Sequence, residues 1–124
     1  MKKFANHVED LDVFQKAYQA SLVIHKLTLS FPKIEQYALG DQLRRATKSI
    51  CANLAEGFAK QKDSKKEFAR YVSLSVGSSD ESRIWVQYAC DLGYIDTTQA
   101  LELKGNYVEI SKMLRGLLSA LTTP

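Results

Sequence analysis

The chain has 124 residues, of which 45% are hydrophobic and 25% are charged, and its formal net charge is +3. This composition is typical of a single soluble globular domain, residues 1–124, with one hydrophobic core. The sequence contains only six glycines and two prolines, which disfavours an all-β fold with many turns and favours a few long helices.

The N-terminus differs from a signal peptide, because acidic residues follow its two lysines where an apolar segment would be required. No apolar run approaches the ~20 residues that a membrane-spanning helix needs. We therefore expect a cytoplasmic protein that does not contact a membrane.

Four helices are predicted, over residues 11–30, 36–57, 65–91 and 98–121. In the first helix, apolar residues recur at three- and four-residue spacing along two neighbouring stripes, which predicts a helix covered on more than one side. The first stripe contains Val13, Ala17, Ala20, Ile24 and Leu27, and the second contains Phe14, Tyr18, Leu22, His25 and Leu29. Pro32 ends this helix, because proline lacks a backbone donor and disfavours the helical conformation of the residue before it.

The second helix contains the segment DQLRRATKSICANLAEG, residues 41–57, whose side chains separate into three faces. The apolar face consists of Leu39, Leu43, Ala46, Ile50 and Leu54. A polar row lies beside it and consists of Gln42, Arg45, Ser49, Asn53 and Glu56. Arg44 and Lys48 point away from both, and we expect the helix to end near Gly57.

The third and fourth helices carry clear boundary residues. Ser64 and Glu67 form a capping box at the start of the third helix, Gly93 ends it, and Asp96 and Gln99 form a second box. One stripe of the third helix is rich in small residues, which permit close approach of a neighbouring helix: Phe68, Val72, Ser75, Ser79, Ser82, Val86 and Ala89. The fourth helix has a bundle seam: Leu103, Tyr107, Ile110, Leu114, Leu117 and Leu121. The predicted fold is an all-α, up-down-up-down antiparallel four-helix bundle.

The polar row of the second helix meets the third helix if the two form an antiparallel hairpin about residue 61. Arg45 would then reach Ser78 or Glu81, and Glu56 would reach Arg70. We interpret this polar seam as a structural network between helices or between subunits, because buried polar networks more often specify packing than chemistry. The polar seam consists of Gln42, Arg45, Ser49, Asn53, Glu56, Ser78 and Glu81. A ligand-binding or catalytic site built from four of them, Arg45, Asn53, Glu56 and Glu81, is the alternative.

Positive charge is concentrated around the connection between the second and third helices. Residues 44–70 contain eight bases and three acids, a net charge of +5, whereas residues 80–124 carry −2. The candidate nucleic-acid-binding residues are Arg44, Lys48, Lys60, Lys62, Lys65, Lys66 and Arg70. The pattern indicates either a solvated face or a phosphate-binding surface, which a homo-oligomer would repeat and strengthen. No base-reading motif is present and no aromatic residue is interleaved with the lysines. Any binding should therefore depend on the phosphate backbone of the nucleic acid and not on its base sequence.

No cofactor, metal or catalytic residue is predicted. Cys51 and Cys90 lack C-x-x-C spacing and nearby histidines, so we expect free buried thiols. His25 has no second potential ligand three or four residues away and is expected to be a packed or interface histidine. Asp80 and Glu81 are adjacent and therefore do not share a helix face, as paired catalytic carboxylates would.

Nearly the whole chain resembles the bacterial four helix bundle protein family, first described as proteins encoded by intervening sequences in large-subunit ribosomal RNA genes. The matching residues are Phe31-Pro32, Gln42, Arg45-Ala46, Ser49-Ile50, Asn53, Ala55-Glu56-Gly57, Phe68 and Gly77-Ser78 with Glu81. The resemblance implies a ring-shaped homopentamer. It also implies kinship with the accessory variability protein of diversity-generating retroelements, which works with a reverse transcriptase and its RNA. Cys51 departs from the family, which usually has proline there, so we expect a straighter turn at residues 53–57.

Three hypotheses follow. The favoured one is a non-enzymatic homo-oligomer that binds RNA or DNA through phosphate contacts, as an accessory to a nucleic-acid enzyme. The alternative is a protein–protein interaction scaffold without a nucleic-acid role, for which replacing the turn lysines by glutamate would change only the isoelectric point. The third is an enzyme that uses Arg45, Asn53 and Glu56 of the polar seam, which a small ligand co-purifying in that seam would support.

Overall fold

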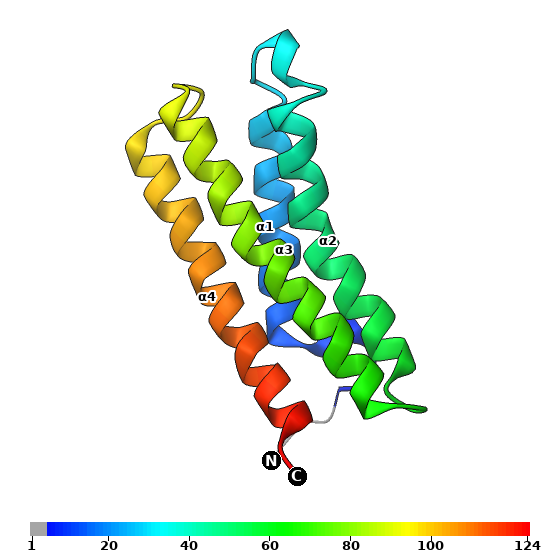
Figure 1. The fold of residues 1–124 in the computed structure, drawn as a ribbon. Coiled ribbons are helices and arrows are strands. Elements are labelled where there is room, and N and C mark those ends of the chain that lie inside the picture. Colours follow the sequence, from blue (N-terminus) through cyan, green and yellow to red (C-terminus); the bar gives the residue numbers. More distant parts are fainter. Residues whose placement is uncertain (1–4) are drawn as a thin grey trace.

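The computed structural model describes residues 5–124 and contains four α-helices that run alternately up and down (Figure 1). They are α1 (Asp12–Thr28), α2 (Leu39–Lys60), α3 (Lys65–Asp91) and α4 (Thr97–Thr122). Two short 3-10 helices, η1 (Val8–Asp10) and η2 (Lys33–Glu35), precede α1 and α2, and residues 5–124 contain no β-strand. The predicted up-down-up-down bundle is confirmed.

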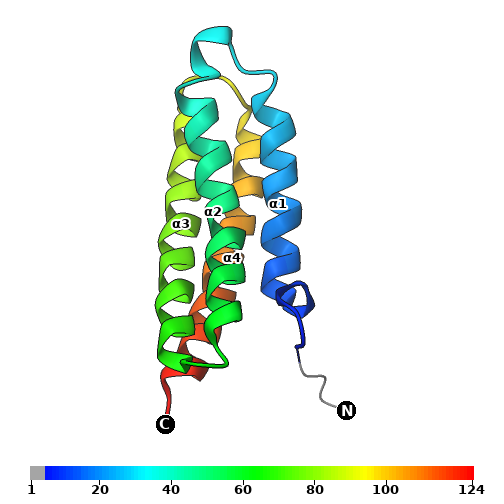
Figure 2. The same cartoon turned by 90° about the vertical axis from the view of Figure 1, so that its right-hand side faces the viewer.

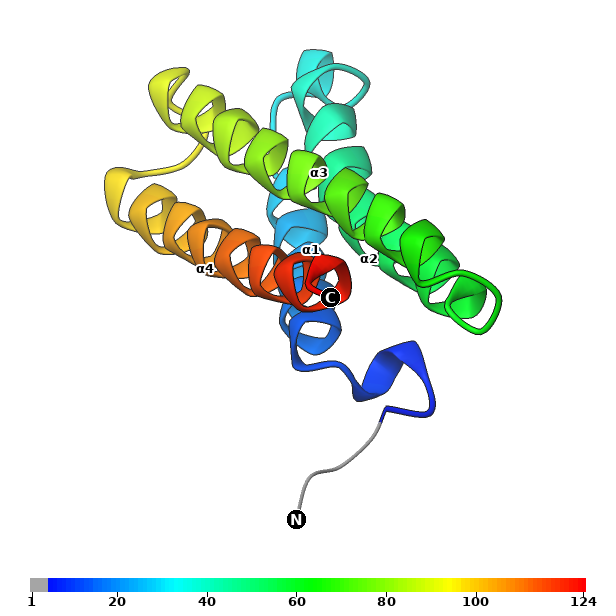
Figure 3. The same ribbon diagram turned by 60° about the horizontal axis from the view of Figure 1, so that its bottom comes forward.

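Each of the four helices packs against two others (Figures 2 and 3). The helix α2 packs against α1 and α3, and α4 packs against α3 and α1. None of the helices in the described part of the chain is long and apolar enough to cross a membrane.

The helix boundaries follow from local backbone chemistry. α3 spans the predicted residues 65–91, and the Ser64 Oγ accepts a hydrogen bond from the Glu67 amide at 3.1 Å. At its other end Gly93 has a φ of 81°, and the Tyr94 amide donates to the Ala89 carbonyl at 2.9 Å, which is a Schellman termination. The helix α4 begins with the predicted reciprocal capping box of Asp96 and Gln99.

The second helix differs from its prediction at both ends. It begins at Leu39 instead of residue 36, because the chain after Pro32 first forms η2. It also continues past Gly57 to Lys60, so the expected end near Gly57 is wrong. Gly57 is instead buried against α3, where it permits close contact.

The core is built from the predicted apolar stripes of all four helices. Its largest fully buried side chains are Ile24, Leu43, Ile50, Leu54, Tyr107, Ile110 and Leu114. The prediction that α1 is covered on a second side is wrong within this protomer, because Tyr18, Leu22 and Leu29 are exposed.

The small residues of α3 allow two neighbouring helices to approach closely, as predicted. The buried Ser75 hydroxyl donates to the Ile50 carbonyl of α2 at 2.9 Å, and the buried Ser79 hydroxyl donates to the Tyr107 carbonyl of α4 at 3.1 Å. Ser111 of α4 donates to the Ser79 hydroxyl at 2.8 Å. These hydrogen bonds satisfy the buried hydroxyls and link α3 to both neighbours.

Candidate nucleic-acid interface

The connection between α2 and α3 gathers five bases at the end of the bundle where α4 also ends (Figure 1). We call this group the basic turn; it consists of Lys60, Lys62, Lys65, Lys66 and Arg70. Residues 60–70 contain these five bases and two acids, Asp63 and Glu67, so their net charge is +3. Among residues 5–124, no ion pair engages any of the four lysines. The positive charge is therefore available to a ligand.

The backbone of this connection is fixed by hydrogen bonds. The amides of Asp63 and Ser64 donate to the Lys60 carbonyl at 3.1 and 3.0 Å, which closes the end of α2. The Ser64 side chain then caps α3. Because the turn is short and capped on both sides, its lysines extend from a defined backbone.

An aromatic side chain lies between two of these bases, contrary to the sequence-based expectation. The Tyr71 ring centroid is 4.5 Å from the Arg70 guanidinium carbon and 5.9 Å from the Lys60 ammonium. Gly57 makes this arrangement possible, since a Cβ at that position would lie only 2.6 Å from the Tyr71 Cβ. Tyr71 directly follows Arg70 in the sequence, whereas its proximity to Lys60 arises across the α2–α3 contact and is not visible along the chain.

Arg70 is the one base of the turn with an acidic partner. Its Nε lies 3.1 Å from one Glu67 carboxylate oxygen and its Nη2 lies 3.3 Å from the other. This hydrogen-bonded pair lowers the pKa of Glu67 and raises the pKa of Arg70, so both stay charged. The predicted pairing of Arg70 with Glu56 is wrong, and Glu56 is exposed on α2.

Arg44 does not belong to a phosphate-binding face, and its predicted outward orientation is wrong. Its guanidinium is half-buried under the α1–α2 connection, where it donates to the Thr28 hydroxyl at 2.8 Å and to the backbone carbonyl of Gln36. The helical rise also separates Arg44 from Lys60 by roughly 24 Å. Arg44 therefore holds the connection that contains η2.

Lys48 is exposed, as expected, but it faces α1. Its Nζ lies 2.9 Å from the Nδ1 of His25, which is half-buried on α1. Lys48 is roughly 18 Å along α2 from Lys60. Lys48 is therefore not part of the basic turn.

The polar seam lies at the surface of the α2–α3 pair and not inside the bundle. Ser78 donates to the Ser49 hydroxyl at 3.0 Å, and Asn53 donates to the same hydroxyl at 3.0 Å. The Arg45 side chain is 76% exposed and lies 3.7 Å from Asp41, one turn earlier. The seam residues Gln42, Arg45, Ser49, Ser78 and Glu81 line an open depression of about 410 Å³.

The predicted pairing of Arg45 across the seam is also not formed. Glu81 is exposed and instead accepts a hydrogen bond from the Trp85 indole nitrogen at 2.8 Å. Ser49, Asn53 and Ser78 thus form a small hydrogen-bonded network between α2 and α3, whereas the charged members Arg45 and Glu81 pair with other residues. A buried catalytic constellation is not present at this position.

Neither cysteine forms a disulfide in the structure. Cys51 and Cys90 are free and half-buried, and burial raises the pKa of the Cys51 thiol to about 11. The part of the chain that the structure describes contains no group of three or more potential metal-binding side chains.

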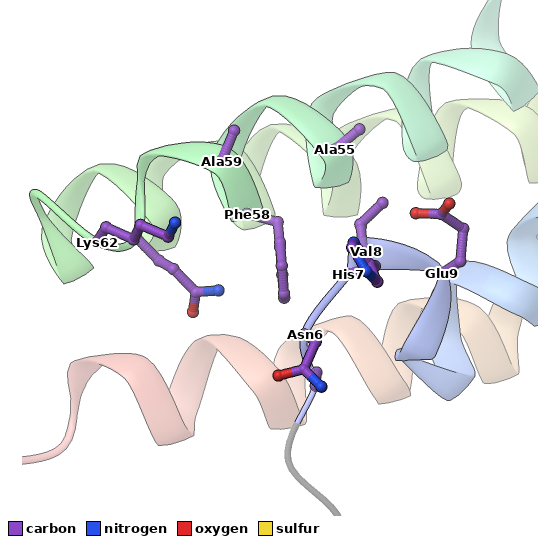
Figure 4. Close-up of a pocket in the computed structure, with 10 residues that line it drawn as sticks. Asn6, His7, Val8, Glu9, Ala55, Phe58, Ala59 and Lys62 are labelled. Atoms are coloured by element: carbon purple, nitrogen blue, oxygen red, sulfur yellow. The ribbon is translucent and has the colours of Figure 1, made fainter.

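Sequence reasoning missed two features next to the basic turn. One is Tyr71, and the other is a pocket between the N-terminal segment and the last turns of α2, lined in part by His7, Phe58 and Lys62 (Figure 4). The signal for Tyr71 was the antiparallel pairing of α2 with α3. No sequence pattern places residues 5–9 against α2.

Comparisons with known proteins agree with this architecture. The model of the 23S rRNA-intervening sequence protein family matches residues 9–116. A crystal structure of a protein of unknown function from the S23 ribosomal protein family, from Bacteroides thetaiotaomicron VPI-5482, is similar with a TM-score of 0.77 and 21% identity. The similarity covers 86% of this chain and 95% of that one, and it shows a shared fold. Among curated proteins there is no significant match. Because the family model spans most of the sequence, this chain belongs to the 23S rRNA-intervening sequence protein family.

Proposed function

We propose that this protein is a non-enzymatic homo-oligomer that binds nucleic acid through phosphate contacts at the basic turn. The observation that carries the proposal is the group of four lysines that form no ion pair within residues 5–124, on a capped, defined turn. Phosphate binding by such lysines releases counterions and does not require base recognition.

Assembly into a ring, with a pentamer expected from the family resemblance, would repeat the basic turn around one rim. The exposed apolar residues of α1 and the open polar seam of α2 and α3 support a contact between copies. A repeated turn would produce a stronger positive field than the formal charge of one chain. Such a particle is suited to hold RNA or DNA as an accessory to a nucleic-acid enzyme.

The test is a binding titration with labelled structured RNA and duplex DNA over a salt series, with the assembly mass measured in parallel. We expect the logarithm of the affinity to fall linearly with the logarithm of the salt concentration. A variant with Lys62, Lys65 and Lys66 changed to glutamate should lose at least about tenfold in affinity and flatten the salt slope by about 2 to 3.

The matched control changes Lys26, Lys33 and Lys112 to glutamate. These lysines are also exposed, lie outside the basic turn and give the same change in net charge. Equal losses in both variants would show that only total charge matters and would reject the basic turn as the site. Absence of binding by the intact oligomer at low salt would reject nucleic-acid binding altogether.

A second candidate function, a protein–protein interaction scaffold, is favoured by the connection that Arg44 holds. This segment exposes Ile34 and Tyr37, whose exposed fractions are 83% and 92%. Apolar side chains on a fixed backbone suit a protein contact, because little conformational entropy is lost on binding. A double change of Ile34 and Tyr37 to serine would abolish partner capture in this case and leave nucleic-acid affinity unchanged.

A further inference from the structure

We propose that the pocket beside the basic turn receives one unpaired nucleobase of a single-stranded nucleic acid. This inference rests on the proposed function and adds the form of nucleic acid that the protein recognises. It predicts that the bases contribute to the binding affinity in addition to the phosphates.

The pocket lies between the segment that leads into η1 and the C-terminal turns of α2 (Figure 4). Its volume is about 520 Å³, which is within the range of small-molecule sites, about 300–1,000 Å³. Asn6 and His7 contribute to one wall, and Phe58, Ala59 and Gln61 contribute to the other. The pocket is thus formed by two segments that are distant in sequence.

The lining residues match the chemistry of a base. Phe58 and His7 provide ring surfaces, and stacking of a base on an aromatic side chain is a main source of single-strand affinity. The side-chain amides of Asn6 and Gln61 form no hydrogen bond within residues 5–124, and each offers both a donor and an acceptor. Base edges present the complementary donors and acceptors.

The charged residues of the pocket indicate how a nucleotide would be oriented in it. Lys62 belongs both to the pocket and to the basic turn, so a nucleotide whose phosphate contacts the turn has its base next to the opening. The carboxylate of Glu9 lies at the opposite end of the pocket from Lys62 (Figure 4). It is therefore away from the phosphate and can accept a hydrogen bond from an exocyclic amino group. A paired base in a duplex is not accessible to such a pocket, which restricts the ligand to unpaired nucleotides.

The experiment compares two labelled oligomers of equal length and equal phosphate count, a single-stranded oligonucleotide and its fully abasic analogue, by fluorescence anisotropy at fixed low salt. We expect the base-containing strand to bind about tenfold more tightly. The variant Ala59→Leu fills the pocket from an exposed position, and Gln61→Ala removes an amide without touching the core. Each should bring the affinity for the base-containing strand toward that of the abasic strand.

Ala52→Leu is the matched control, because Ala52 is also an exposed alanine of α2 and does not line the pocket. It should leave both affinities unchanged. Equal binding of the two strands by the wild-type protein overturns the inference and leaves the proposed function intact. Preferential binding that both pocket variants retain also overturns it. Failure of both strands to bind while structured RNA or duplex DNA still binds overturns only this inference, whereas failure of all four probes overturns the proposed function itself.

Discussion

Replacing Gly57 by alanine tests whether the close contact of α2 and α3 organises the basic turn. A Cβ at this position would lie 2.6 Å from the Tyr71 Cβ and 3.1 Å from the Phe68 Cδ1. Two carbon atoms prefer a separation of about 3.5–4.0 Å, so the two helices would have to move apart by about 1 Å. Both contacts are at the start of α3, directly beside the basic turn.

Two opposing effects determine the change in stability. Alanine in place of glycine inside a helix stabilises by about 1 kcal/mol, because the unfolded chain loses less conformational freedom on folding. Overpacking of a tight contact costs about 1–3 kcal/mol. The Cβ–Cβ distance of 2.6 Å is far below the preferred separation, and Cβ atoms cannot rotate away, so the cost of overpacking should exceed the gain from alanine. We expect a net loss of stability of about 1–2 kcal/mol.

Urea unfolding followed by circular dichroism measures this difference through the transition midpoint. The matched control is Gly105→Ala in α4, where an added Cβ meets no atom within 4 Å and should stabilise by up to about 1 kcal/mol. The two substitutions are therefore expected to have opposite signs. If Gly57→Ala stabilises the protein as Gly105→Ala does, the close contact of α2 with α3 is refuted.

Four further predictions concern single side chains. Tyr107 has a buried hydroxyl without a hydrogen-bond partner among the described residues, so Tyr107→Phe should stabilise the protein by about 1–3 kcal/mol in thermal or urea unfolding. Burial raises the pKa of this phenol, so the folded state keeps its proton above pH ~10 while the unfolded state loses it. The stability of the wild-type protein should therefore fall above that pH, and Tyr107→Phe should lose less stability over the same range. Burial raises the pKa of the Cys51 thiol from 9.0 to about 11, so at pH 8 it should react with iodoacetamide about 100-fold more slowly in the native protein than in urea. Its contribution to the free energy of unfolding should be lost between pH 9 and 11. Equal reaction rates in the native protein and in urea would contradict its burial. Arg44→Ala should destabilise by about 1–3 kcal/mol and speed hydrogen exchange in residues 29–38, because Thr28 and the Gln36 carbonyl lose their donor. Arg45→Ala should change protomer stability by less than about 0.5 kcal/mol, since its side chain is 76% exposed, but should lower the assembly mass; an unchanged mass would reject the polar seam as a subunit contact.

The fold could be predicted because its determinants are local and repeated. The stripe from Leu39 to Leu54 is entirely buried, and Ser64, Gly93 and Asp96 mark helix ends in the structure as they do in the sequence. Periodicity specifies which face of a helix is buried, and capping residues specify where it ends. Both signals act within a few residues, so they do not depend on knowing the tertiary structure.

The candidate site could be predicted only in part, because its remaining features depend on how distant segments meet. Arg44 is on the outward side of α2 by helical spacing, but the end of α1 and the connection after Pro32 provide acceptors for it, the Thr28 hydroxyl and the Gln36 carbonyl. Tyr71 becomes a neighbour of Lys60 only when Gly57 brings the helices together. Likewise, nothing near Phe58 in sequence indicates that residues 5–9 will lie beside it.

The two surfaces that the protomer leaves open can be distinguished by their chemistry. The exposed stripe of Tyr18 and Leu22 on α1 and Leu29 directly after it follows the regular spacing of a buried helix face, yet this protomer does not cover it. A sequence that maintains such a pattern over about three helical turns is consistent with a partner surface, which supports the proposed contact between copies. The basic turn has the opposite character, because lysine ammonium groups without acidic partners are unfavourable in a dry contact. In the proposed assembly the apolar stripe is therefore covered while the basic turn stays accessible. Substitutions in the basic turn should leave the assembly mass unchanged, whereas substitutions in the apolar stripe should lower the assembly mass and, because the repeated positive field is lost, the nucleic-acid affinity with it.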